Sequence, residues 1–99
     1  MLDQIIVIRP DFAEAWNKRA TVYFLIDDYG DSLSDIRQTL ALEPRHFGAL
    51  AGFATILQAM DRNAEAIRVF RRALEINPRM EQVRESLERL EKETGGDDI

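Results

Sequence analysis

The side chains able to do acid–base, nucleophilic or metal chemistry are few. His46 is the only histidine, and neither a nucleophile nor a pair of carboxylates lies near it in the sequence. We therefore expect His46 to be a solvated loop residue rather than a catalytic or metal-binding one. The chain has no cysteine, which excludes disulfides, zinc–thiolate sites and thiol nucleophiles. These residues favour a protein that is not an enzyme, with no bound metal and no cofactor.

Three aspartates around Gly30 could suggest a calcium site. Asp27, Asp28 and Asp31 are close in the sequence. A calcium-binding loop, however, needs acids at alternating positions, glycine at its sixth position and glutamate at its twelfth. The twelfth residue counted from Asp27 is Gln38. Because aspartate and glycine are also typical turn residues, the segment is predicted to be a turn between two helices.

A cluster of arginines could form a phosphate-binding stripe. Glu65 and Glu75 lie within one helical turn of these arginines, and the chain carries 18 acidic against 13 basic residues, a net charge of -5. This balance favours a solvated face and argues against nucleic acid or an anionic membrane as partner. No apolar run approaches the roughly 18 residues of a membrane span, so no membrane insertion is expected. The arginines are Arg62, Arg68, Arg71, Arg72 and Arg79.

The length and composition indicate one small globular domain. The chain has 99 residues, of which 45% are hydrophobic and 31% charged. The absence of cysteine suits reducing and oxidising compartments alike, so it does not indicate a localisation.

The sequence repeats every 34 residues. Pro10, Pro44 and Pro78 are separated by 34 residues in both cases, and each follows a similar apolar stretch. Between the prolines, apolar residues recur at helical spacing in two stripes, which predicts two amphipathic helices in each unit. The prolines are expected to end the second helix of each unit, because proline has no N–H and restricts the residue before it. Asp11 is expected to cap the helix that begins near Ala13.

Corresponding positions of the two units carry similar residue types. These are Trp16, Ala20, Tyr23, Ser32, Ile36, Thr39 and Pro44 in the first unit, and Leu50, Phe53, Ala54, Leu57, Ala66, Phe70, Ala73 and Pro78 in the second. Together they resemble the tetratricopeptide repeat family, whose pattern is Trp-x2-Leu-Gly-x2-Tyr, then Ala-x3-Phe, a further small residue and Pro. Arg19 departs from the family's leucine, and Ser32 and Thr39 are larger or more polar than its alanines.

The resemblance implies an all-α fold, a right-handed α-solenoid of antiparallel helix pairs with a C-terminal capping helix. Val83, Leu87 and Leu90 fall on one face of the last predicted helix, as expected of a cap. The expected segments are a trailing helix of a truncated repeat at 1–12, repeats at 13–46 and 47–80, the capping helix at 81–94 and an acidic tail at 95–99.

The function implied by the resemblance is that of a protein–protein interaction scaffold. In the family, the first helix of each pair lines a concave groove, where a partner peptide or helix would bind. The small face at positions 48, 51, 52 and 55 either belongs to this groove or packs tightly on the preceding pair. The expected groove residues are Glu14, Asn17, Lys18, Thr21, Phe24, Gly48, Ala51, Gly52, Thr55, Gln82, Ser86 and Arg89.

One ligand type of the family is not expected here. Chaperone-binding members hold a C-terminal carboxylate with lysine, asparagine and arginine on the concave helices, and the basic residues are missing from the matching positions of this chain. These positions are Asn17, Thr21, Gly52, Gln82 and Ser86. The identity of the partner stays unknown.

Self-association is the alternative function. Aligned on Pro10, the first residues form the end of a second helix without its first one, so Leu2, Ile5, Ile6 and Ile8 are expected on an uncovered apolar edge. Either the chain was cut from a longer repeat protein, or something else covers the edge, such as a second copy in a homodimer. Bacterial repeat proteins with a stretch similar to residues 12–17 are sometimes exported, so periplasm and cytoplasm both stay open.

Overall fold

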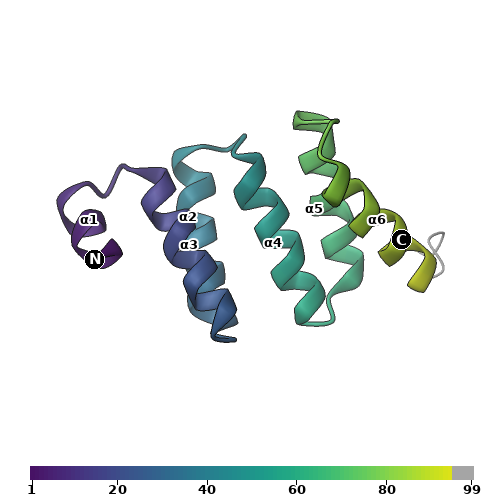
Figure 1. Ribbon diagram of the computed structural model, residues 1–99, viewed down its shortest axis with the longest axis horizontal. Helices are drawn as coiled ribbons and strands as arrows, with labels where there is room; N and C mark the ends of the chain where they lie inside the picture. Colours follow the sequence, from purple (N-terminus) through teal and green to yellow (C-terminus); the bar gives the residue numbers. More distant parts are fainter. Residues whose placement is uncertain (95–99) are drawn as a thin grey trace.

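The computed structural model describes residues 1–94, which form six helices and no strand. Each helix packs against the next one along the chain, in an elongated body of 45 × 26 × 19 Å. The expected all-α solenoid is thus confirmed, while the acidic tail expected at 95–99 lies outside the described residues. The helices, coloured from purple to yellow in Figure 1, are α1 (Leu2–Ile8), α2 (Ala13–Leu25), α3 (Tyr29–Leu42), α4 (Phe47–Ala59), α5 (Asn63–Ile76) and α6 (Glu81–Glu93).

A left-handed aspartate follows the first helix of each repeated pair. Asp27 comes after α2 with a φ of 64°, and Asp61 comes after α4 with a φ of 63°. Aspartate enters this region more readily than most residues because its short side chain forms local hydrogen bonds. Asp28 then caps α3, its carboxylate accepting a hydrogen bond of 3.4 Å from the Asp31 N–H. The predicted turn is confirmed for Asp27 and Asp28 only, because Gly30 and Asp31 already belong to the first turn of α3.

The prolines follow the ends of α1, α3 and α5. The last helical residues are Ile8, Leu42 and Ile76, each two positions before a proline. This placement is the expected one, because proline cannot continue the helical hydrogen-bond ladder.

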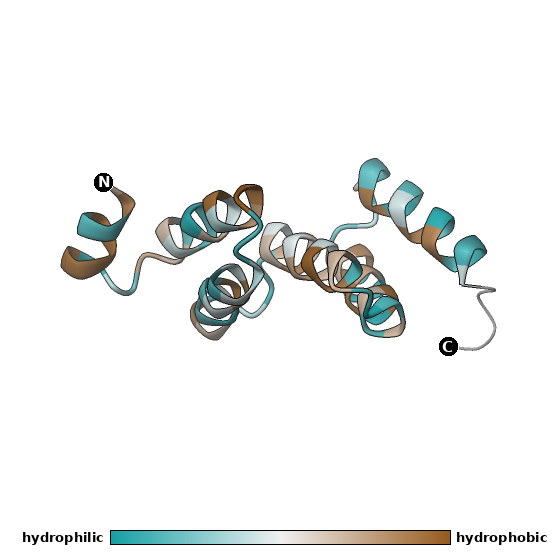
Figure 2. Cartoon of the chain, turned by 90° about the horizontal axis from the view of Figure 1, so that it is seen from below, coloured by the Kyte–Doolittle hydropathy of each residue, from teal (hydrophilic) through white to brown (hydrophobic). Residues whose placement is uncertain are grey.

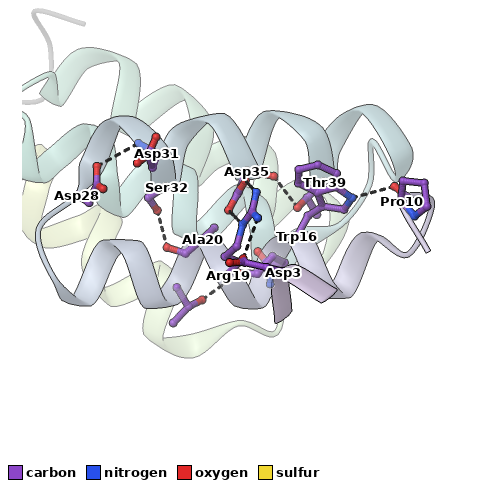
Figure 3. Close-up of polar contacts among 12 residues, drawn as sticks. Asp3, Pro10, Trp16, Arg19, Ala20, Asp28, Asp31, Ser32, Asp35 and Thr39 are labelled. Atoms are coloured by element: carbon purple, nitrogen blue, oxygen red, sulfur yellow. Dashed lines mark hydrogen bonds and ion pairs between the residues drawn. The ribbon is translucent and has the colours of Figure 1, made fainter. Parts of the chain in front are cut away.

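The connection into α2 differs from the expectation. Phe12, not Asp11, occupies the N-cap of α2, and it forms no side-chain cap. Asp11 instead forms an exposed ion pair with Arg9, with 3.5 Å between its Oδ1 and the Arg9 Nε. Trp16 fixes the connection, because its indole N–H donates a hydrogen bond of 2.8 Å to the Pro10 carbonyl (Figure 3).

Two apolar clusters form the core, and α4 contributes to both. The N-terminal cluster joins α2, α3 and α4, whereas the C-terminal cluster joins α4, α5 and α6. Buried alanines recur in both, which lets the helix axes approach closely. The N-terminal cluster contains Ala20, Leu33, Ile36, Ala49 and Ile56, and the C-terminal cluster contains Leu50, Ala54, Leu57, Ala66, Ile67, Phe70, Ala73, Val83, Leu87 and Leu90.

A polar bridge joins α1, α2 and α3 (Figure 3). The Arg19 guanidinium donates two hydrogen bonds of 2.8 Å to Asp35, whose side chain is 4% exposed, and a third of 3.0 Å to Asp3. The rings of Trp16 and Tyr23 lie 5.3 and 5.7 Å from its central carbon. The hydrogen bonds with Asp35 raise the pKa of Arg19, so the arginine stays charged. An ion pair therefore occupies a position where the family pattern has an apolar residue.

The two other polar departures from the pattern are also hydrogen-bonded. Ser32 Oγ donates to the Ala20 carbonyl at 2.6 Å, and Thr39 Oγ1 donates to the Asp35 carbonyl at 2.9 Å. Both side chains are fully buried. Across residues 1–94, every buried side-chain nitrogen or oxygen has a partner, so these substitutions leave no unpaired polar group in the core.

Candidate functional site

One hollow lies between α2 and α4, and we name it the α2–α4 hollow. It has a volume of about 190 Å³. Two buried residues of α3, Ser32 and Ile36, form part of its floor. Its walls come from α2, with Asn17, Ala20, Thr21 and Phe24, and from α4, with Gly48, Gly52, Thr55 and Ile56.

Two glycines keep the α2–α4 hollow open. A Cβ added at Gly52 would lie 3.5 Å from Ile36 Cδ1, which is an ordinary van der Waals contact. The space beside this glycine therefore holds a methyl group without a clash. A Cβ at Gly48 would lie 3.2 Å from the His46 ring, which is tighter. Because larger residues at either position would fill the space between the helices, the hollow depends on these small side chains.

A second hollow, named the α4–α6 hollow, adjoins the first. It has a volume of about 380 Å³ and shares Thr55 with the α2–α4 hollow. We name the two hollows together the groove. Figure 2 shows α2 and α6 on the upper side of the molecule, and α3 and α5 on the lower side. The residues that line the α4–α6 hollow are Ala51, Thr55, Phe70, Met80, Glu81, Gln82, Val83 and Ser86.

The two threonines of the groove present acceptors rather than donors. Thr21 Oγ1 donates to the Asn17 carbonyl at 3.2 Å, and Thr55 Oγ1 donates to the Ala51 carbonyl at 2.9 Å. Each hydroxyl proton is thus used within its own helix, while the oxygen keeps lone pairs for a further hydrogen bond. Asn17, which also lines the α2–α4 hollow, donates one amide N–H to Glu14 Oε1, with 3.5 Å between Nδ2 and Oε1, and keeps its second N–H as a donor.

The groove is nearly free of charge. No lysine, arginine or histidine lines either hollow in the part of the chain that the structure describes, and Glu81 is the one ionisable side chain among the lining residues. Glu81 itself lies 3.0 Å from Arg84, with which it forms an exposed ion pair.

Most of the expected groove residues come together in the structure. Nine of the twelve line one of the two hollows, although this placement does not test whether they bind a partner. The other three are Glu14, Lys18 and Arg89, all exposed and outside both hollows. The nine are Asn17, Thr21, Phe24, Gly48, Ala51, Gly52, Thr55, Gln82 and Ser86.

The floor of the groove was not predicted from the sequence. The predicted residues lie on one face of the first helices and of the capping helix, whereas buried residues on other faces and on the second helices close the hollows from below. Their membership in the apolar stripes would have been the available signal. The unpredicted lining residues are the buried Ala20, Ser32, Ile36, Ile56, Phe70 and Val83, the half-buried Met80 and the exposed Glu81.

His46 is not the solvated loop residue that we expected. Its ring Nδ1 accepts a hydrogen bond of 2.9 Å from the Ala49 N–H, so the side chain caps α4. Its Nε2 lies 3.2 Å from Glu14 Oε1 on α2, and the side chain is largely covered. His46 therefore fixes the start of α4 and links the two repeats beside Gly48. This role was not predicted, because the sequence around His46 carries no capping signal.

The expected apolar edge is only partly exposed. Ile6 is buried as α1 packs on α2, and Leu2 and Ile5 are half-buried, so including Ile6 in an exposed edge was wrong. Ile8 is 76% exposed, and the neighbouring Val7, which the expectation omitted, is 80% exposed. The rotation of α1 about its own axis directs Ile6 toward α2, and Val7 and Ile8 away from it. The alignment of the repeats does not determine this rotation.

The described residues contain neither a candidate membrane span nor a candidate metal site. No helix within residues 1–94 is both long and apolar enough to cross a membrane. In the same residues, no group of three or more histidine, aspartate or glutamate side chains is placed to hold a metal ion.

Comparison of the sequence with known proteins finds the same repeat. The tetratricopeptide repeat family model matches residues 48–80. A TPR repeat-containing protein of Rhizobium etli is 40% identical over 95 residues, which cover 96% of this chain and 47% of that protein. The chain thus spans about half the length of this curated relative.

Solved structures share the fold at low sequence identity. The first TPR domain of Spaghetti (RPAP3), bound to the HSP90 peptide SRMEEVD, has a TM-score of 0.90 at 19% identity, over 95% of this chain and 75% of that one. MamA has a TM-score of 0.88 at 19% identity, over 95% and 55%. The Arabidopsis OM64 TPR domain has a TM-score of 0.87 at 20% identity, over 92% and 75%.

Proposed function

Because the chain belongs to the tetratricopeptide repeat family, we propose that it is a protein-interaction module whose groove binds a peptide or helix of a partner protein. The proposal involves recognition by a rigid scaffold and no chemical reaction. Asn17, Thr21, Gly52, Gln82 and Ser86 are among the groove residues that would contact the ligand.

The observation that carries the proposal is the pair of adjoining hollows on either side of Thr55. The hollows open between neighbouring repeats and are lined by apolar residues with a few polar groups at the mouth. Ligand sites commonly have this composition, because apolar surface supplies affinity and a few polar groups fix orientation. Since Ile36 and Ile56 are held in the N-terminal cluster, the site needs little rearrangement before binding.

A structural relative supports the proposal in general terms only. The Spaghetti domain was solved with an HSP90 peptide, which places a peptide on a protein of the same fold. The positions at which we expected no carboxylate clamp carry no basic residue here, so the ligand of this chain would differ from one anchored by a C-terminal carboxylate.

A library of random displayed peptides tests the proposal. We expect the chain to enrich a recurring sequence motif, and Gly52→Leu to abolish that enrichment because its side chain would fill the α2–α4 hollow. Gly30→Leu is the matched control, since nothing lies within 4 Å of a Cβ at that exposed glycine. Helical circular dichroism and thermal melting check that both variants fold. Absence of any enriched motif, or equal enrichment by Gly52→Leu, would reject the groove as the binding site.

We also propose self-association through the N-terminal edge as a second function, because large apolar side chains are exposed there. Met1, Val7 and Ile8 are each more than three-quarters exposed, and they are the three most exposed large hydrophobic residues of residues 1–94. The same edge of a second copy is the occupant that would cover them, in a symmetric homodimer.

Light scattering across a concentration series tests the dimer. We expect a concentration-dependent rise toward twice the monomer mass, and a folded monomer for the double variant Val7→Ser and Ile8→Ser. Met60→Ser, at an exposed methionine after α4, is the control and should still dimerise. A wild-type chain that stays monomeric at high concentration, or a double variant that still dimerises, would contradict the proposal.

A further inference from the structure

We infer that the groove takes an uncharged internal segment of an extended peptide, with one apolar side chain in the α2–α4 hollow, and not a free C-terminal carboxylate. This inference rests on the function proposed above, because it specifies the ligand of the same groove. Three features of the groove carry it: the apolar depth of the hollow, the acceptors at its mouth and the lack of cations in its lining.

The depth of the α2–α4 hollow suits one apolar side chain. Ala20, Ile36 and Ile56 are all buried and lie beneath the opening, and Phe24 lies at the α2 side. Water in such a hollow finds few polar partners, so an aliphatic or aromatic side chain that displaces it removes apolar surface from solvent on both molecules. A volume of about 190 Å³ is enough for a single such side chain.

The mouth of the hollow selects hydrogen-bond donors. Thr21 on α2 and Thr55 on α4 both line it, and both hydroxyl protons are already donated to carbonyls of their own helices. The lone pairs of each threonine oxygen can still accept a hydrogen bond from an N–H group. The backbone N–H groups on either side of an inserted side chain are the donors that an extended peptide brings to such a mouth.

The charge of the groove disfavours a carboxylate. A carboxylate loses its hydration on entering a hollow and needs a cation or several N–H donors in return. Among the described residues, no lysine, arginine or histidine lines either hollow, and Asn17 is the one side chain with N–H donors that lines the α2–α4 hollow. Lys18 and Arg89, the nearest expected cations, lie outside both hollows. A free C-terminus or an acidic side chain should therefore bind this site more weakly than its uncharged counterpart does.

Matched small probes test this chemistry directly. The probes are N-acetyl-leucine N-methylamide, N-acetyl-leucine with its free carboxylate, and N-acetylglycine N-methylamide, each titrated into the ¹⁵N-labelled chain at concentrations up to about 10 mM, which detects millimolar affinity. We expect the leucine amide to shift the amide resonances of Thr21, Gly52 and Thr55 in a saturable way. The carboxylate probe should bind about tenfold more weakly or not at all, and the glycine probe should cause no saturable shift.

Variants connect the shifts to the groove. Gly52→Leu should remove the response to the leucine amide, and Gly30→Leu should keep it. Thr55→Val preserves the shape of the threonine and removes its acceptor, so it should weaken the leucine amide several-fold; this variant serves even if Gly52→Leu fails to fold. Equal affinity for the carboxylate probe, no response to the leucine amide, or unchanged affinity in Thr55→Val would each overturn the inference.

The outcome is separable from that of the proposed function. If displayed peptides bind through the groove while the leucine carboxylate binds as well as the amide, the inferred ligand chemistry is wrong and the binding function stands. If neither displayed peptides nor any probe bind, both are wrong.

Discussion

The bridge between Arg19 and Asp35 can be exchanged for the apolar pair that the second repeat uses at the same place. Shifted by the repeat length of 34 residues, Arg19 corresponds to Phe53 and Asp35 to Val69. Both of these residues pack against the C-terminal cluster. The double variant Arg19→Phe and Asp35→Val thus gives the first repeat the two apolar residues that the second repeat has at the corresponding positions.

The two single variants should differ in cost because the two charges are buried to different depths. Arg19→Phe leaves the Asp35 carboxylate without its cation. Because this carboxylate is only 4% exposed, little water can replace the cation, and the free energy of unfolding should fall by about 3–5 kcal/mol. Asp35→Val leaves Arg19 23% exposed and still 3.0 Å from Asp3, so the loss should be about 1–2 kcal/mol. The double variant should lie within about 1 kcal/mol of the wild type, because no unpaired charge remains.

Urea unfolding followed by helical circular dichroism measures these differences. A domain of this size is stable by about 5–15 kcal/mol, so a loss of this size shifts the midpoint clearly. The expected cycle has a large coupling energy, with the double variant more stable than Arg19→Phe alone. Single effects that simply add in the double variant, or a greater loss for Asp35→Val than for Arg19→Phe, would refute the reasoning.

Three smaller changes give further expected outcomes. Gly52→Ala should raise the free energy of unfolding by about 1 kcal/mol, because its Cβ meets Ile36 at ordinary contact distance and helical glycine is unfavourable; a lower melting temperature would contradict this. His46→Ala should lose about 1 kcal/mol in urea unfolding, whereas His46→Asn should recover most of it by capping Ala49, and equal losses would show that the cap is unimportant. Asp61→Gly should be more stable than Asp61→Ala by about 1 kcal/mol because its φ is positive, and the reverse order in thermal melting would argue against a strained turn.

Features that depend on local chain chemistry were predictable from the sequence. The prolines at a fixed spacing mark helix ends whatever surrounds them, and Asp27 and Asp28 form the turn before α3, where the Asp28 side chain caps the helix. The groove residues on α2 and α4 were also predictable in part, since helical spacing places positions such as Gly48 and Gly52 on one face.

Features that depend on how helices meet were not predictable. Arg19 and Asp35 are 16 positions apart on different helices, and only the crossing of α2 and α3 brings them to 2.8 Å. His46 gave no capping signal, because histidine is an uncommon cap and its second contact, Glu14, lies on another repeat. The rotation of α1 that buries Ile6 depends on the same long-range packing.

Because α4 belongs to both apolar clusters, its two sides are covered at different times during synthesis of the chain. Phe47–Ala59 contains no ionisable residue and packs into the core on both sides. During synthesis α2 and α3 precede it, so one side of α4 meets its neighbours as soon as the helix forms. The other side stays uncovered until α5 has been added. A chain released near Met60 would therefore keep a long apolar helix in water and aggregate, whereas one released after Ile76 would have it enclosed.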